Sequence, residues 1–550
     1  MSVDEQLTGL PTPDRDGRRR LRDRLNDLLV PPDGEDGRPS AAPRTDVSVL
    51  GRPEAPPGRR TGLAAGGLGP RVAVAVLVAG VLTRFLPAGP LWFDEAQSVG
   101  IARLPVMQLF AALRQDGSPP LYYLLLHGWM LLVGRSAFAV RALSGLISVA
   151  TIPVFERLAR RVLPERARWP AILLLASSPF AIRFADEARM YSLVVLVVAL
   201  GSLALLRAHE RTSTPRLVLV SLASGALALT HYWGLFLLAA LGIGLAWRAR
   251  RRDVAARRVL LALLGGGILF APWVPSLLFQ IRHTGTPWQH AGPFDSTVAL
   301  AAWAGAMGAG PALYAAVPLV PLLLGLVAAG SLRTPAARRL TWLALGGVAL
   351  AGFSSFLLGA AVVPRYTSIG LVPYLAAAAA GIVALRPPWG RRALAAAIAL
   401  GLVAGTLDAT APRTLAGKAA ALLRRDGSPA DTVVYCPDQL GPDVSRLLPH
   451  WYLQEMYPTG AFPDRVDWVN YAARNWLSSP TLFARRASAM AGNQPVWLLE
   501  ANDFASYFGQ CGRLVHAFAQ LRPQSVTYSL GADPMSAREH ELLIEYKPGP

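Results

Sequence analysis

Long apolar stretches separated by short polar connections occupy residues 70–410. A stretch of about 20 apolar residues can cross the hydrocarbon core of a bilayer as a helix. The pattern therefore predicts an α-helical polytopic membrane domain in this part of the chain. The candidate spans cover residues of about 71–88, 139–158, 169–184, 190–207, 216–233, 234–248, 259–280, 312–331, 340–362, 367–385 and 393–410.

The charges between these stretches predict which way the helices run. With the N-terminus inside, the connections after the second, fourth, sixth, eighth and tenth helices are also cytoplasmic. All five are rich in arginine, as in Arg-Ala-Arg-Arg-Arg at 248–252, and cytoplasmic loops carry an excess of basic residues. The sequence thus predicts about 11 transmembrane helices with a cytoplasmic N-terminus.

The apolar segment 119–133 is too short for a comfortable span, and it contains His127 and several aromatic residues. Counting it as a span would invert every later loop and place the arginine clusters outside. We therefore expect a juxtamembrane helix along the outer interface, within a first external loop of about 89–138.

The two flanks of the membrane domain differ from it in composition. Residues 1–69 are polar and rich in Pro, Gly, Arg and Asp, which predicts a disordered cytoplasmic tail without a cleavable signal peptide. Residues 411–550 are predicted to form a small extracytoplasmic α/β domain. Its expected strands are 432–435, 495–499 and 542–546, and its expected helices lie near 415–425, 440–456 and 510–521.

Composition narrows the class of protein further. Apolar residues make up 53% of the chain, as in integral membrane proteins. The net charge of +19 is almost all arginine and is spread over the short connections, so it does not indicate nucleic-acid binding. The arginine, alanine and proline content is typical of a GC-rich bacterium, which predicts the bacterial plasma membrane as location. Cys436 and Cys511 form either one disulfide or two buried thiols.

Unusual polar residues collect at the helix ends that this topology places outside. An active site that opens outward is therefore predicted on that face. The residues are Asp94, Glu95 and Asp116 after the first helix, Asp186, Glu187, Arg189 and Tyr191 after the third, His231 after the fifth, and Arg365 and Tyr366 after the ninth.

These residue types suit sugar transfer from a lipid-linked donor, because the outer face of a bacterial membrane has no ATP or nucleotide sugars. A carboxylate, Asp94 or Glu95, would take the proton of an attacking hydroxyl. Arginines would stabilise the departing phosphate. The candidate cations are Arg84, Arg141, Arg189 and Arg365.

Simpler explanations exist for each of these residues. The acidic pair could cap an interfacial helix, and Arg84 and Arg141 could snorkel to lipid headgroups. Arg189 and Arg365 each stand near a tyrosine, and these tyrosines could simply form an interfacial belt. His231, His283 and His290 are too scattered to predict a metal site, and the two cysteines lack metal-ligand spacing. No phosphate-binding glycine motif occurs in a strand–turn–helix context.

The motifs resemble those of a known family. Leu91-Trp-Phe-Asp94-Glu95-Ala is similar to the Asp-Glu motif in the first external loop of protein O-mannosyltransferases and lipid A aminoarabinose transferases. Asp116-Gly-Ser118-Pro-Pro resembles their His-Pro-Pro-Leu motif, with serine in place of histidine. Phe138-Ala-Val-Arg141 resembles the arginine-bearing start of their second helix. The resemblance covers residues of about 71–385.

The resemblance implies a GT-C fold and an inverting transfer from a polyprenyl-phosphate sugar without a metal cofactor, although other GT-C enzymes use a divalent ion. It implies that Asp94 is the general base, that Glu95 orients the acceptor or the base, and that Arg141 braces the loop. Ser118 places any acceptor-binding role of that motif in doubt.

The sequence leads to a polyprenyl-phosphate-dependent glycosyltransferase that acts on an envelope glycan, glycolipid or protein and contacts the lipid bilayer. Mannose and arabinose are both plausible sugars. The alternatives are a transporter or flippase for a lipid-linked sugar, which should show inverted repeats with broken helices, and a non-catalytic assembly protein.

Overall fold

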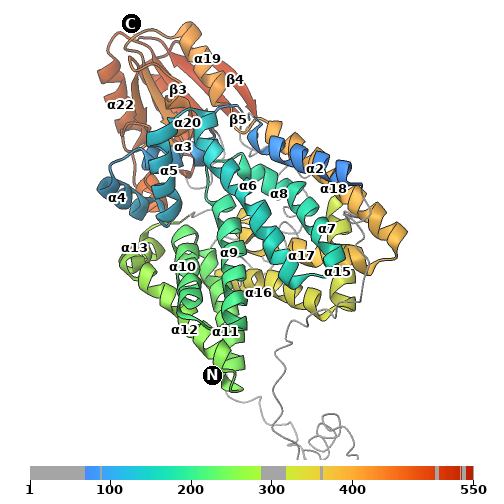
Figure 1. Ribbon diagram of the computed structural model, residues 1–550. Helices are drawn as coiled ribbons and strands as arrows, with labels where there is room; N and C mark the ends of the chain where they lie inside the picture. The colour runs from blue at the N-terminus through green and yellow to red at the C-terminus, as the bar shows by residue number, and fades with distance from the viewer. Residues whose placement is uncertain are drawn as a thin grey trace, which may run out of the picture. The chain divides into compact units, whose positions relative to one another are not determined.

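The computed structural model describes residues 69–86, 89–285, 318–358, 363–501, 507–532, 534 and 540–548. Except for residue 69, the expected N-terminal tail lies outside the described residues, and so does His290. The structure is mostly helical up to residue 410 and contains a mixed β-sheet after it (Figure 1).

The expected apolar stretches of the first 410 residues are mostly helical where they are described. The elements are α2 (Pro70–Leu82), the 3-10 turn η2 (Thr83–Phe85), α3 (Phe93–Ala102), α4 (Val106–Asp116), α5 (Leu121–Val133), α6 (Ala137–Val162), α7 (Glu165–Ala176), α8 (Pro179–Ala185), α9 (Tyr191–Glu210), α10 (Thr214–Thr230), α11 (Trp233–Arg250), α12 (Val254–Phe270), η3 (Ala271–Trp273), α13 (Val274–His283), α15 (Leu319–Arg333), α16 (Pro335–Leu358), η4 (Pro364–Gly370), α17 (Leu371–Ala384) and α18 (Pro387–Thr410).

Among the described residues, five helical stretches are long and apolar enough to cross a membrane. They are Ala137–Val162, Tyr191–Glu210, Val254–His283, Pro364–Ala384 and Pro387–Thr410. Shorter apolar helices accompany them, including α5 and α10. These helices are those of a polytopic membrane protein.

One predicted span, 169–184, is two helices in the structure. The α7 helix ends at Ala176, and α8 starts at Pro179. Ser178 caps the new helix by accepting a hydrogen bond from the Ala181 backbone N–H at 3.3 Å, and proline is favoured at the first helical position. The continuous helix expected there is therefore wrong.

Small residues allow the central helices to approach closely. The most enclosed candidate span contains α17, whose residues 376–380 are all alanine. A Cβ atom added to Gly381 would lie 1.9 Å from the backbone oxygen of Leu326 on α15. Helices in membranes pack by such close backbone contacts, because no hydrophobic difference between protein and lipid drives them together.

A five-stranded sheet in the order β2-β1-β3-β5-β4 organises the C-terminal region. Strands β1, β2 and β3 are parallel, with Thr432 opposite both Leu453 and Val496, while β5 pairs antiparallel with both β3 and β4. The elements are α19 (Ala416–Asp426), β1 (Thr432–Cys436), η5 (Asp438–Leu440), α20 (Gly441–Ser445), β2 (Leu453–Met456), α21 (Tyr471–Trp476), α22 (Pro480–Ala491), β3 (Val496–Ala501), α23 (Gln510–Leu521), β4 (Ser525–Ala532) and β5 (His540–Tyr546).

Side chains of the sheet alternate between two apolar cores. Val434 and Leu498 pack with α22 and α23 on one face, whereas Val433 and Leu499 pack with α19 on the other. Both faces of the sheet are thus covered by helices (Figure 1), as the alternation of a strand allows. Cys436 at the end of β1 forms a disulfide with Cys511 of α23.

The C-terminal region contains α21, α22 and β4, which were not predicted, and it contradicts the prediction in one segment. Residues 440–456 were expected to be helical, but only the short α20 is, and the stretch ends in strand β2. Leu453–Met456 becomes a strand because it pairs in parallel with β1. Strand formation depends more on such neighbours than on local propensity.

Candidate active site

The two adjacent acids point in different directions from the start of α3. They are the second and third residues of this helix, so their side chains diverge by about 100° around its axis. The side chain of Glu95 is fully buried, whereas that of Asp94 retains 15% exposure. Only Asp94 can therefore meet a ligand without a rearrangement of the helix.

Glu95 holds the surrounding backbone together through Arg141 of α6. The Arg141 Nε and Nη2 groups donate to the two carboxylate oxygens at 2.8 and 2.5 Å. The backbone N–H of Ala188 donates to the same carboxylate at 2.9 Å, and Arg141 also donates to the carbonyls of Gly89 and Pro90. Burial raises the pKa of Glu95, but Arg141, Arg413 and the Ala188 N–H together outweigh burial, so that the pKa lies below its usual value.

Asp94 lies instead beside two cations from distant parts of the chain. Its Oδ2 atom is 3.2 Å from Nη2 of Arg365, in η4, and 3.8 Å from Nη2 of Arg189, in the turn before α9. Arg189 Nη1 also donates to Ser98 of α3 and to Tyr123 of α5. The fold therefore gathers the acid and both arginines at one place.

Aromatic rings line the same place. The His231 ring lies 4.9 Å from that of Tyr366 and 5.9 Å from that of Tyr191. The Arg365 guanidinium lies 5.9 Å from the Trp92 ring. We call Asp94, Arg189, Tyr191, His231, Arg365 and Tyr366 the Asp94 cluster.

Several buried donors of the Asp94 cluster have no hydrogen-bond partner among the described residues. They are Nε of Arg189, Nε of Arg365 and the hydroxyl group of Tyr191. Buried donors are nearly always paired in folded proteins, so each unpaired one requires an explanation. An anion with several oxygens, such as a phosphate, would satisfy them.

Asp186 and Glu187 belong to a second, buried set of charges. Asp186 pairs with Arg413 at 3.2 Å, and Arg183 lies 3.6 Å from Glu187 and 3.7 Å from Asp408. These side chains are at most 5% exposed. Burial raises the pKa of Asp186 to about 7, which the nearby arginines only partly offset. This set supports the loop that carries Arg189.

Sequence reasoning did not single out Arg413 or Asp408. Both lie at the junction between α18 and the C-terminal region. The signal for Asp408 was its place in the last turns of an apolar helix, where charge is costly.

Two further predicted site residues lie outside the Asp94 cluster. The Arg84 guanidinium is buried and donates to Ser148 and to the carbonyls of Leu175 and Ala176, near the end of α7. Asp116 accepts a hydrogen bond from Gln97 at 2.9 Å and one from Tyr123 at 3.4 Å. Arg84 is thus occupied by the protein itself, and Asp116 borders the cluster through Tyr123.

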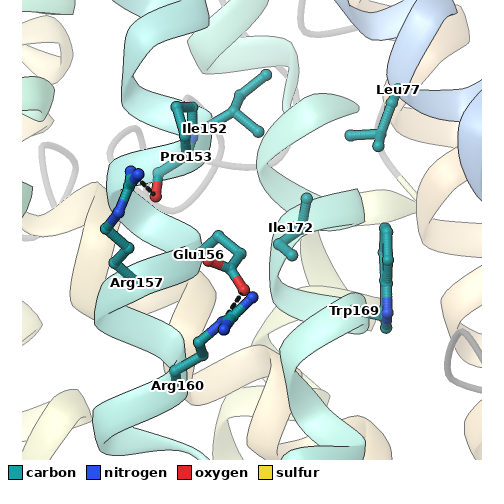
Figure 2. Close-up of a pocket in the computed structure, with 8 residues that line it drawn as sticks. All are labelled: Leu77, Ile152, Pro153, Glu156, Arg157, Arg160, Trp169 and Ile172. Carbon is teal, nitrogen blue, oxygen red and sulfur yellow. Dashed lines mark hydrogen bonds and ion pairs between the residues drawn. The ribbon is translucent and has the colours of Figure 1, made fainter. Parts of the chain in front are cut away.

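A groove of about 410 Å³ between α2, α6 and α7 lies elsewhere in the molecule (Figure 2). Its lining consists of Leu77, Ile152, Pro153, Glu156, Arg157, Arg160, Trp169 and Ile172. The distance along α6 from residue 141 to residue 152 is roughly 16 Å. Arg160 pairs with Glu156, and Arg157 donates to the Pro153 carbonyl. The groove is therefore separate from the acidic pair.

We find no metal site among the residues that the structure describes. No three of their His, Cys, Asp or Glu side chains form a group that could hold an ion. Positive charge at the Asp94 cluster comes from Arg189 and Arg365 instead.

Part of the chain matches a known protein family. Residues 117–275 match the family model described as dolichyl-phosphate-mannose-protein mannosyltransferase. The resemblance drawn from the sequence is thereby confirmed. We call residues 117–275 the mannosyltransferase-family segment. It contains Arg141, Asp186, Glu187, Arg189, Tyr191 and His231, whereas Asp94, Glu95 and Arg365 lie outside it.

Solved structures show the same fold. ArnT from Cupriavidus metallidurans, bound to undecaprenyl phosphate, is 15% identical with a TM-score of 0.54, over 86% of this chain and 96% of that one. Its apo state gives 16% identity and a TM-score of 0.54, over 86% and 97%. The mannosyltransferase-family segment thus lies within an ArnT-like GT-C fold, that of a multi-pass membrane protein. No curated protein matches the chain by sequence.

Proposed function

We propose that this chain is an inverting GT-C glycosyltransferase that moves a sugar from a polyprenyl phosphate to a hydroxyl group, with Asp94 as general base. One observation carries the proposal. The partly exposed carboxylate of Asp94 lies beside Arg189 and Arg365, and the Nε groups of both arginines lack hydrogen-bond partners among the described residues. A base next to unsatisfied cations is what this reaction requires.

The reaction would proceed in one displacement. The acceptor oxygen attacks C1 of the sugar from the face opposite the phosphate, and the bond between C1 and the phosphate oxygen breaks. The proton of the acceptor hydroxyl passes to the carboxylate of Asp94. The polyprenyl phosphate leaves with the electron pair, and its added negative charge is stabilised by Arg189 and Arg365.

The remaining predicted residues would support this step. Glu95 and Arg141 fix α3 against α6, and Tyr191, His231 and Tyr366 line the donor site beside the arginines. Asp186 and Glu187 hold the loop that carries Arg189. We assign Arg84 to helix packing rather than to donor binding, because its guanidinium is bonded to protein carbonyls.

We further propose that the site opens on the outer face of the bacterial plasma membrane. The arginine-rich connections predict about 11 spans with a cytoplasmic N-terminus, and residues 411–550 would then form an extracytoplasmic domain. The disulfide between Cys436 and Cys511 supports this orientation, because disulfides persist in oxidising compartments. The donor would carry mannose or arabinose, and the acceptor would be an envelope glycan, glycolipid or protein.

Replacing Asp94 by Asn tests the proposal. In cells that lack the intact gene, this variant should fail to restore the missing sugar, as measured by mass spectrometry of envelope glycans and glycoproteins. The purified variant should keep the thermal unfolding and the polyprenyl-phosphate binding of the parent. Asp426→Asn, an acid of the C-terminal surface, is the matched control and should restore the sugar. If Asp94→Asn restores the sugar as fully as the parent protein does, the proposed enzyme reaction is excluded.

A further inference from the structure

The helix that carries Asp94 is attached to the C-terminal region along one face. Gln97 of α3 exchanges two hydrogen bonds with the backbone of Val466. Its Nε2 donates to the Val466 oxygen at 2.9 Å, and its Oε1 accepts from the Val466 N–H at 2.8 Å. Gln97 is 2% exposed, so this pair is shielded from competing water. A buried two-way pair fixes both the position and the rotation of the glutamine side chain.

Three residues further along α3, the two backbones come into close contact. A Cβ atom on Gly100 would lie 2.2 Å from the backbone oxygen of Asp464, a distance that no side chain allows. Another turn on, Arg103 forms a 2.8 Å ion pair with the Asp464 carboxylate. Residues 97, 100 and 103 share one face of the helix, and that whole face rests on residues 464–466.

The same stretch of the C-terminal region also contacts the other helices around the site. Trp468 packs edge-on against Phe93, next to Asp94, at 6.0 Å, and its backbone N–H donates to the Gln115 carbonyl at the end of α4. The Asn470 N–H donates to the His283 carbonyl at the end of α13. We call residues 464–470 the docking segment. Figure 1 shows α3 close to the C-terminal elements, and α3 packs against α20 there.

Gln97 has a further contact on the substrate side. Its Nε2 group donates to Asp116 Oδ1 at 2.9 Å as well as to Val466. It stands three residues after Asp94, so the two side chains arise from the same turn of α3. A shift of α3 would move the Asp94 carboxylate relative to Arg189 and Arg365, which lie on other elements.

We propose that the docking segment sets the position of Asp94 through Gln97 and Gly100, which makes Gln97 a positioning residue for the transfer step. This inference rests on the proposed function, in which Asp94 is the base. A displacement of about 1 Å in a reacting group can lower a rate roughly 100-fold. The donor-phosphate arginines do not contact the docking segment in any described interaction, so donor binding should depend on it only weakly, through the hydrogen bond from Arg189 to Ser98 of α3.

Two glycine substitutions make a matched test. Gly100→Ala forces α3 away from Asp464, whereas Gly128→Ala adds the same methyl group to helix α5 of the same loop, where nothing lies within 4 Å. We expect Gly100→Ala to lower kcat for sugar transfer about 10- to 100-fold with an unchanged KM for the lipid-linked donor. Gly128→Ala should match the parent in both.

Gln97→Met keeps the length of the side chain but removes its hydrogen bonds, and it covers the case in which Gly100→Ala does not fold. It should lower kcat in the same way while polyprenyl-phosphate binding is retained. The proposal is overturned if both kcat values equal that of Gly128→Ala, or if kcat, donor KM and Tm deteriorate together. Since Asp94→Asn is measured in parallel, transfer by that variant would instead reject the proposed function.

Discussion

Asp94 and Glu95 are neighbours in the sequence but have different surroundings, so their substitution should have different effects on stability. Glu95 is fully buried and bonded to Arg141 through both oxygens, so Glu95→Gln leaves a buried guanidinium without its counter-charge. Breaking a buried ion pair in this way costs about 3–5 kcal/mol. We expect a clearly lower Tm for Glu95→Gln and a near-parental Tm for Asp94→Asn, measured by thermal unfolding in detergent. Equal Tm values for the two variants would contradict this division.

The two arginines of the Asp94 cluster should differ from ordinary surface arginines in how they tolerate lysine. The Nη2 group of Arg365 forms an ion pair with Asp94, and its Nε group has no hydrogen-bond partner among the described residues. A lysine ammonium group cannot offer two such separate donors. Arg365→Lys should weaken polyprenyl-phosphate binding about tenfold, as measured by titration of the purified protein. Arg425→Lys on the surface should leave the affinity unchanged, and equal affinities for both variants would argue against a phosphate site.

Asp186 predicts a dependence of stability on pH. Burial raises its pKa to about 7, whereas an unfolded aspartate titrates near 3.9. Its contribution to stability is therefore fully present below about pH 4 and is lost as the pH rises through about 7. Asp186→Asn should flatten the fall in Tm between about pH 5 and pH 8. Parallel Tm profiles for parent and variant would show that Asp186 does not titrate in this range.

At the scale of single residues, the sequence predicted those site residues that stand out from their immediate neighbours along the chain. Asp94, Glu95 and Arg189 stand at the ends of apolar runs, where a charged side chain is conspicuous. Gln97 and Arg413 gave no comparable signal. Their importance comes from partners 369 and 227 positions away, and no pattern of neighbouring residues encodes such a contact.

At the scale of elements, the apolar pattern predicted the helices but not their interruptions. The Ser-Ser-Pro run at 177–179 carried the cap and proline signals of a new helix. The apolar pattern continues across it, so length alone predicted one span. The extent of β2 could not be predicted, because Leu-Gln-Glu-Met has no strand-like alternation and becomes a strand only beside β1.

Arg84 connects two elements and should behave as a packing residue. Its guanidinium donates to the carbonyls of Leu175 and Ala176 and so satisfies backbone groups at the end of α7. Arg84→Met should lower the Tm while the KM for the lipid-linked donor stays at the parental value. A raised KM with an unchanged Tm would return Arg84 to the donor site.

At the scale of the whole molecule, the proposed orientation can be tested with introduced cysteines. Leu477 in the C-terminal region is 81% exposed, and Trp389 at the start of α18 is 60% exposed. The native cysteines are paired with each other and should not react. A membrane-impermeant maleimide should label Leu477→Cys in intact cells and Trp389→Cys only after lysis. The reverse pattern would invert the topology.

The contact between Gln97 and Val466 also has a consequence for the synthesis of the protein on the ribosome. Helix α3 leaves the ribosome 369 residues before its partner, which corresponds to roughly 20 to 70 s of synthesis. In the proposed topology Asp94 would by then already lie at the outer face, but α3 would lack the surface that holds it. A chain that ends before residue 464 should therefore transfer sugar more slowly than the full chain, even where its membrane helices are inserted.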